Sequence, residues 1–188
     1  MSNYRAPSAS GMQLSWSDWQ GEPASDVNMR WENEGWTCEV HMHADNALAI
    51  LRMSAMWTVQ QMLLFRDLDE PDLWLATDGH GRWGEMNGAH RTELDGCVDI
   101  DFIGTPFTNS VLTHRLPLHV GHTAELPVIT IDVETLSVVP VVHRYTRHDE
   151  NAWEWSASGE GSGHAMNVDE YGLVIDMHGS FRRAEPAR

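Results

Sequence analysis

Asp99 and Asp101 are the residues of this chain whose type and spacing could most directly do chemistry. They interrupt an apolar, strand-like pattern, and residues two apart on a strand point to the same face. Asn109 and Arg115 follow on a short stretch with helical spacing. Together these groups could hydrogen-bond the hydroxyls of a sugar-like ligand, or they could form an ion-pair network among themselves.

The two carboxylates also permit an enzymatic hypothesis. Glycoside hydrolysis uses two carboxyl groups roughly 5–9 Å apart, normally on opposite sides of the bond that is cleaved. Asp99 and Asp101 on one strand face fit that arrangement poorly, so we assign no catalytic residue. An enzyme that uses these acids on a glycoside or lipid stays an alternative, and a purely structural dimeric module is another.

The elements that must position these residues are predicted to be mostly strands. Turn dipeptides such as Asn87-Gly88 and Asp95-Gly96 separate short runs rich in Trp, Val, Ile and Met, a pattern typical of antiparallel hairpins. Strands are expected near residues 37–43, 47–56, 59–68, 73–77, 82–86, 89–94, 97–102, 116–120, 128–133, 138–145, 152–158, 165–168 and 173–177.

One helix is predicted over residues 106–115. Thr105 is a suitable N-cap and Pro106 a suitable first helical residue. Phe107, Val111 and Leu112 then share a face at helical spacing. The predicted fold class is therefore all-β with a single short α-helix.

Three segments resemble the signature of a bacterial family of "putative glycolipid-binding" proteins, long catalogued as a domain of unknown function. They are Gly81-Arg82-Trp83, Glu93-Leu94-Asp95-Gly96-Cys97-Val98-Asp99-Ile100-Asp101 and Thr105-Pro106-Phe107-Thr108-Asn109. The resemblance implies one large antiparallel sheet that curls around a single helix like a half-barrel, distantly similar to lipoprotein-localisation carriers. It also implies a homodimer. We expect a single domain over residues 12–183, between a disordered tail at 1–11 and a C-terminal tail at 184–188.

The resemblance implies a binding function without chemistry. The ligand would be a glycolipid or another sugar-bearing amphiphile, held in an acidic pocket between the concave sheet and the helix. Aromatic faces can stack on sugar rings. The expected ligand-binding residues are Asp99, Asp101, Asn109, Arg115, Trp83 and Tyr145. The chain departs from the family pattern at 111–114 and at Met177-His178, so the rim of the pocket is expected to differ.

Composition narrows the classes of partner. The 28 acidic and 12 basic residues give a formal net charge of −16, which argues against nucleic acid and anionic membrane surfaces. No apolar run has the length of a membrane span, and Met1–Gly11 has no apolar core of a secretory signal, so a cytoplasmic protein is expected. Cys38 and Cys97 are predicted to be reduced and buried, and no metal or cofactor is expected.

Overall fold

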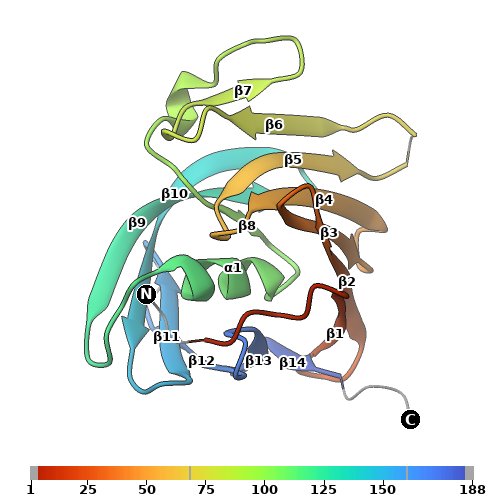
Figure 1. The fold of residues 1–188 in the computed structure, drawn as a ribbon. Helices are drawn as coiled ribbons and strands as arrows, with labels where there is room; N and C mark the ends of the chain where they lie inside the picture. Colours follow the sequence, from red (N-terminus) through yellow and green to blue (C-terminus); the bar gives the residue numbers. More distant parts are fainter. Residues whose placement is uncertain (1–3, 68, 160, 185–188) are drawn as a thin grey trace.

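The computed structural model describes residues 4–67, 69–159 and 161–184. Within these residues, one sheet of fourteen strands curls around the single helix α1 (Figure 1), as predicted. The elements are β1 (Met12–Asp18), β2 (Pro23–Glu32), β3 (Gly35–Met42), β4 (Ala47–Ser54), β5 (Val59–Phe65), β6 (Leu73–Thr77), β7 (Trp83–Glu85), the 3-10 helix η1 (Thr92–Leu94), β8 (Ile100–Phe102), α1 (Phe107–Arg115), β9 (Thr123–Asp132), β10 (Ser137–Arg147), β11 (Ala152–Ala157), β12 (His164–Val168), β13 (Val174–Met177) and β14 (Phe181–Arg183).

The strand order is β7-β6-β5-β4-β3-β2-β1-β14-β13-β12-β11-β10-β9-β8, so the sheet is not closed. Most neighbours are successive antiparallel hairpins. One exception pairs β1 with β14, which brings the two ends of the chain together at Trp16 and Arg183. The other is a parallel pair of β8 and β9, and α1 lies between these two strands in the chain. The helix is thus the crossover connection that a parallel pair requires.

Alternation along the strands places the core inside the curl. In β4, for example, Ala47, Ala49, Leu51 and Met53 are buried, and the residues between them point outward. Helix α1 lies between two apolar clusters. Phe107 and Val111 belong to the larger cluster, and Leu112 belongs to the smaller one.

The helix begins one residue later than predicted. Pro106, not Thr105, occupies the N-cap position, with φ −82° and ψ 0°. Thr105 still supplies an oxygen at this end, because its hydroxyl accepts a hydrogen bond from the Phe107 amide at 3.3 Å. It also shares a hydrogen bond of 2.8 Å with Ser25 of β2, which ties the start of α1 to the sheet.

Two predicted strands were wrong. Residues 89–94 contain the 3-10 helix η1, where the Leu94 amide bonds to the Arg91 carbonyl, and only an isolated bridge at His90. Residues 116–120 do not form a strand. Pro117 has no amide hydrogen to donate, and the Leu118 carbonyl accepts a hydrogen bond from the Arg147 side chain instead of from a neighbouring strand.

Strands β1, β2 and β14 were not predicted. Residue 68, the end of one predicted strand, lies outside the described residues, as do 1–3 and 185–188 of the two predicted tails. Both cysteines are free and buried, as predicted. Burial raises the pKa of each thiol, so neither is a reactive thiolate. No helix of the described part is long and apolar enough to cross a membrane.

Residues 4–11, here called the strap, fall in the segment expected to be a tail. They run beside α1 toward β1 (Figure 1). The Tyr4 hydroxyl donates to the Glu150 carbonyl at 3.0 Å and accepts from the Trp153 indole at 2.8 Å. Gly172 makes room for this ring, because a Cβ there would lie 2.6 Å from Tyr4. Pro7 is buried.

We expect Gly35→Ala to lower the free energy of unfolding by about 1–3 kcal/mol. Its Cβ would lie 2.3 Å from the backbone oxygen of Met53 on the paired strand β4, so the hairpin would have to shift. Gly161→Ala is the matched control, because a Cβ there has no neighbour within 4 Å. Urea denaturation checks both; equal stability of the two variants would contradict the close approach of β3 and β4.

Candidate functional site

The predicted acid pair faces α1. Asp99, immediately before β8, forms a two-point ion pair with Arg115 at the end of the helix. In this pair the Arg115 Nε donates to Asp99 Oδ1 at 2.8 Å, and Nη2 contacts Oδ2. Asp101 accepts a hydrogen bond from the Thr108 hydroxyl on the first turn of α1. The Asp99 side chain has no exposed surface, and Asp101 is 6% exposed.

Asn109 and Tyr145 form the other half of this arrangement. The Tyr145 hydroxyl, on β10, donates to Asn109 Oδ1 at 2.6 Å, and both residues are buried. Trp83 lies apart from them. Its indole donates to the Cys97 carbonyl at 2.8 Å, which ties β7 to the segment before β8. The structure therefore brings five of the six predicted residues to α1 and places Trp83 in a different contact.

Burial and neighbouring charges shift the pKa values of Asp99 and Tyr145 in this site. Burial raises the pKa of Asp99, and the adjacent Arg115 guanidinium opposes that rise. Burial also raises the pKa of Tyr145 well above its ordinary value, and the nearby Asp101 and Asp99 add to the rise. Tyr145 therefore keeps its proton and can donate to Asn109 at any ordinary pH.

The arrangement holds the helix. Asp99, Asp101, Asn109, Tyr145 and Trp83 are all buried. None of the six predicted residues lines the tryptophan-rich pocket at the end of α1, the polar pocket beside Arg147, or three other surface pockets on the described residues. The Asp99 carboxylate has no exposed surface and Asp101 has little, so neither is open to a sugar in this structure.

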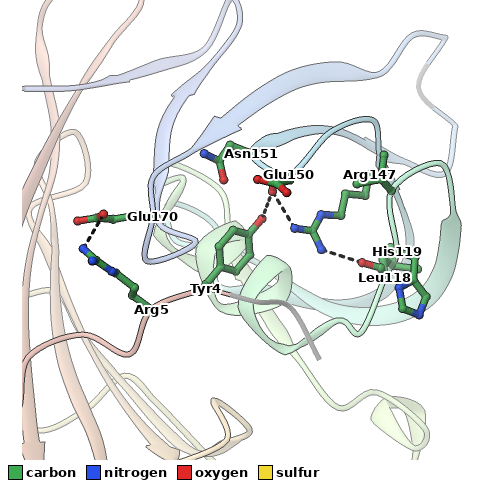
Figure 2. A pocket seen from close by; sticks show the side chains of 9 residues that line it. Tyr4, Arg5, Leu118, His119, Arg147, Glu150, Asn151 and Glu170 are labelled. Atoms are coloured by element: carbon green, nitrogen blue, oxygen red, sulfur yellow. Dashed lines mark hydrogen bonds and ion pairs between the residues drawn. The ribbon is translucent and has the colours of Figure 1, made fainter.

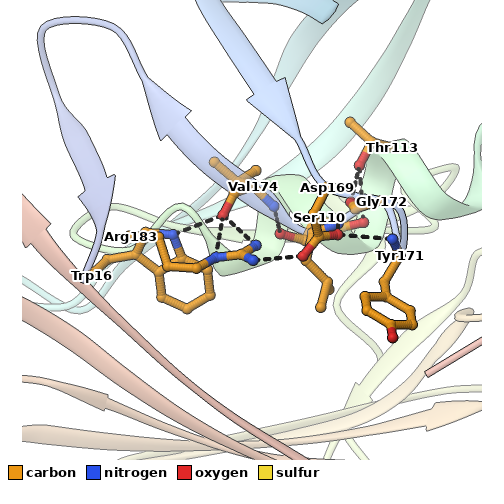
Figure 3. A network of polar contacts seen from close by, with 9 residues as sticks. Trp16, Ser110, Thr113, Asp169, Tyr171, Gly172, Val174 and Arg183 are labelled. Carbon is orange, nitrogen blue, oxygen red and sulfur yellow. Dashed lines mark hydrogen bonds and ion pairs between the residues drawn. The ribbon is translucent and has the colours of Figure 1, made fainter. Parts of the chain in front are cut away.

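A second network fastens the middle of the helix, and sequence reasoning missed it. The Ser110 hydroxyl accepts a hydrogen bond from the Val174 amide at 2.9 Å (Figure 3). The Thr113 hydroxyl lies 3.0 Å from the Gly172 carbonyl and 3.1 Å from the Ser110 carbonyl. The start of β13 is thereby joined to α1 through polar groups that are all buried.

The start of β13 is also bonded to residues of β1 and β14. The Val174 carbonyl accepts hydrogen bonds from the Trp16 indole at 3.0 Å and from the Arg183 guanidinium at 2.6 and 3.0 Å (Figure 3). Arg183 also pairs with Asp169 at 2.5 Å. β1, β13 and β14 therefore meet at one carbonyl, next to the helix.

An aromatic pocket of about 280 Å³ opens at the C-terminal end of α1. It is lined by Ala6, Pro7, Ala9, Trp31, Trp36, Ala55, Trp57 and His114, and we call it the tryptophan pocket. The ring centroids of Trp31 and Trp36 lie 5.0 Å apart, edge to face. Trp57 stacks on His114, with 4.1 Å between centroids and 14° between planes.

Local backbone geometry places these rings. Trp31 and Trp36 are paired across the β2–β3 hairpin, whose two-residue turn has Asn33 and Glu34 at φ 51° and 61°. Such a turn matches the twist of the strands. Trp57 has φ 64°, a left-handed conformation that is rare for a bulky residue and persists only where its surroundings hold it. The stacking of Trp57 on His114 and the burial of its side chain stabilise this conformation.

A second pocket of about 440 Å³ lies at the other end of the strap (Figure 2). We call it the polar pocket; it is lined by Tyr4, Arg5, Leu118, His119, Val120, Arg147, Glu150, Asn151 and Glu170. Arg147 forms its floor. This guanidinium donates to the Leu118 and Glu150 carbonyls, both at 2.8 Å, and lies 5.3 Å from the centre of the Tyr4 ring.

Comparison with known proteins agrees with this architecture. The family model described as "Putative glycolipid-binding" matches residues 13–183. The chain belongs to that family. A crystal structure of a DUF1089 family protein from Pseudomonas aeruginosa, at 1.80 Å resolution, is similar to this family member with a TM-score of 0.73 and 26% identity. The match covers 96% of this chain and 95% of that chain. No curated protein matches the chain.

The sequence of this family member held a partial signal for the tryptophan pocket. The Asn33-Glu34-Gly35 turn could have suggested that Trp31 and Trp36 pair across a hairpin. Nothing local links them to Trp57, His114 or the strap, because those contacts join segments far apart in the chain.

We expect Asp99→Asn to lower the free energy of unfolding of this family member by about 3 kcal/mol, because it leaves the Arg115 charge without its buried partner. Asp95→Asn is the control, since it removes a partly exposed partner of His90 and should cost less than about 1 kcal/mol. Guanidinium denaturation at pH 7 measures both. Equal small losses would show that the Asp99–Arg115 pair does not hold α1.

We expect the stability of this family member to depend on pH through His114. Burial lowers the pKa of His114 to about 4, whereas an unfolded histidine titrates near ~6.5. Between these values the unfolded chain binds a proton that the folded chain does not, so the free energy of unfolding falls as the pH is lowered from about 6.5 toward 4. His114→Phe should remove on the order of 1 kcal/mol of that fall between pH 7 and 5. Denaturation curves at both pH values would contradict this assignment if the variant kept the full slope.

Proposed function

We propose that this protein binds a sugar-bearing amphiphile without chemical conversion, and that the apolar part of the ligand lies in the tryptophan pocket. The observation that supports this most is the convergence of Trp31, Trp36 and Trp57 on one small cavity at the end of the helix. Membership of a family described as putative glycolipid-binding fits the same class of ligand.

The lining of the tryptophan pocket suits an alkyl segment. Besides the three indoles, it consists of alanines, a proline and the His114 ring. The lowered pKa keeps His114 neutral at pH 7, so no charge is brought by the pocket's own lining. Indole faces bind alkyl groups and the C–H faces of sugar rings. A volume of about 280 Å³ lies near the lower end of small-molecule sites, enough for part of an amphiphile.

In this proposal five of the six residues predicted from the sequence act mainly through the helix, whereas Trp83 ties β7 to the segment before β8. Asp99 and Arg115 fix the end of α1, next to His114 in the tryptophan pocket. Asp101, Asn109 and Tyr145 fix its first turns. Direct contact between these side chains and ligand hydroxyls stays a prediction.

We also propose that two copies of the chain associate through the outer face of β4, β5 and β6. Leu48, Ile50, Leu63, Phe65 and Trp74 point away from the core on these strands and are only half-buried. Register places Ile50, Leu63 and Trp74 side by side, and Leu48 beside Phe65. On a chain with a net charge of −16, this apolar row, beside which the outward positions of β4, β5 and β6 carry Arg52 but no acidic residue, is where a second copy can approach with least repulsion.

We expect Trp31→Ala to weaken the binding of dodecyl maltoside, below its critical micelle concentration, by about tenfold, because an indole face is lost from the tryptophan pocket. Trp19→Ala is the matched control. Trp19 packs on Arg182 and His178, away from that pocket. Isothermal titration calorimetry measures both affinities, and an unchanged affinity for Trp31→Ala would rule out this pocket.

We expect Leu63→Glu to convert the dimer to monomers, because it places a charge in the centre of the outer apolar row. Gln61→Glu is the control, on the same face of β5 two residues away, where the neighbour is Arg52. Sedimentation velocity distinguishes the two forms. A monomeric wild type, or a dimeric Leu63→Glu variant, would contradict the proposed interface.

A further inference from the structure

The two pockets share the strap as a common wall. Tyr4 and Arg5 line the polar pocket, and the next residues, Ala6 and Pro7, line the tryptophan pocket. The rings of Tyr4 and His114, one from each pocket, have centroids 6.2 Å apart. The two pockets are therefore close enough for one amphiphile that crosses the strap to reach both.

The strap is fixed where the pockets meet. The Arg5 amide donates to the Glu170 carbonyl at 2.8 Å, and the Tyr4 hydroxyl bonds both Glu150 and Trp153. Because Gly172 leaves space under the Tyr4 ring, the ring sits against the sheet. The wall between the pockets is thus part of the folded structure.

The polar pocket carries the groups that recognise hydroxyls. The Glu150 carboxylate, the Asn151 amide and the His119 imidazole are exposed around it (Figure 2). An amide and a carboxylate together offer both donors and acceptors, which the hydroxyl groups of a sugar require. Three backbone carbonyls accept hydrogen bonds from the Arg147 guanidinium, which fixes its position in the lining of the pocket.

The balance of charges in the polar pocket favours an uncharged headgroup over a charged one. Its two arginines, Arg5 and Arg147, are matched by two glutamates, Glu150 and Glu170, and Arg5 is paired with Glu170 at 2.9 Å. A phosphate would meet two carboxylates and no free arginine pair. An uncharged, hydroxylated group meets hydrogen-bonding partners without a charge penalty.

We infer that the polar pocket is the headgroup subsite: it binds the uncharged sugar of the amphiphile whose apolar part lies in the tryptophan pocket, with the strap between them. This inference rests on the proposed function. It adds that the headgroup is neutral and that Asn151 and Glu150 contact its hydroxyls.

The test compares three amphiphiles with the same dodecyl chain, all below their critical micelle concentrations: dodecyl maltoside, dodecyldimethylamine oxide and dodecyl phosphate. Calorimetry gives the affinity of each for the wild type and three variants. Asn151→Ala removes the side-chain amide of the polar pocket and leaves the backbone bond from Val168 in place. Asn167→Ala is the matched control on the exposed side of β12, and Trp31→Ala reports on the tryptophan pocket.

We expect Asn151→Ala to weaken the affinity for dodecyl maltoside about five- to tenfold. The affinity of this variant for dodecyldimethylamine oxide should stay within about twofold of the wild-type value. Trp31→Ala should weaken the affinity for both of these amphiphiles, and Asn167→Ala should change neither affinity. If Asn151→Ala leaves the maltoside affinity unchanged while Trp31→Ala weakens it, the headgroup subsite is wrong and the proposed function stands. Tighter binding of dodecyl phosphate than of the maltoside would also overturn the neutral-sugar assignment. If Trp31→Ala changes no affinity, the proposed function itself fails.

Discussion

The fold depends on burying a helix that is largely polar. Phe107–Thr113 of α1 are buried, yet Thr108, Asn109, Ser110 and Thr113 each carry a hydrogen-bonding side chain. A buried polar group without a partner costs free energy, so the sheet has to meet these side chains with complementary groups. It does so with Asp101, Tyr145, the Val174 amide and the Gly172 carbonyl, which come from β8, β10 and the start of β13, in one half of the sheet. Ring contacts reach the other half: Phe107 lies beside Trp16 of β1, and His114 stacks on Trp57 between β4 and β5. Through both sets of contacts the helix joins the two halves of an open sheet.

This constraint also places the surface features that we connect with binding. The Asp99–Arg115 pair fixes the end of α1, and the preceding residue, His114, is stacked on Trp57. The strap then runs past this end, with Tyr4 on one side and Pro7 on the other. Removing one partner of a buried ion pair is costly, because the other charge is left in the interior without compensation. Here the pair helps to shape the pocket without lining it.

Sequence reasoning located the helix and the strand beside it because their signals are local. The Thr105-Pro106 start and the spacing of Phe107, Val111 and Leu112 predicted α1 to within one residue. The convergence of Asp99 and Arg115 followed from placing a strand before that helix. The curled sheet came from the resemblance to a family. What local patterns could not supply was the burial of the whole cluster, because Tyr145 and Val174 reach it from distant strands.

The missed elements have long-range causes. β14 is three residues long and exists because it pairs with β1, at the other end of the chain. The tryptophan pocket needs the β2–β3 hairpin, the left-handed Trp57, the end of α1 and the strap together. The two wrong strands failed because other groups took the backbone's partners: a 3-10 turn bonds the Leu94 amide to the Arg91 carbonyl, and the Arg147 side chain bonds the Leu118 carbonyl. Alternating polarity alone does not reveal such competition.

The central claim, that a ligand lies in the tryptophan pocket and not at the buried acids, is tested most directly by following the indole N–H signals in ¹H–¹⁵N NMR spectra. Dodecyl maltoside would be titrated below its critical micelle concentration. Trp31, Trp36 and Trp57 line the pocket, whereas the Trp83 indole is bonded to Cys97 beside the acid pair. We predict shifts at the three pocket indoles with Trp83 unchanged. A shift at Trp83 with Trp31, Trp36 and Trp57 unchanged would contradict the account and favour a site at Asp99 and Asp101.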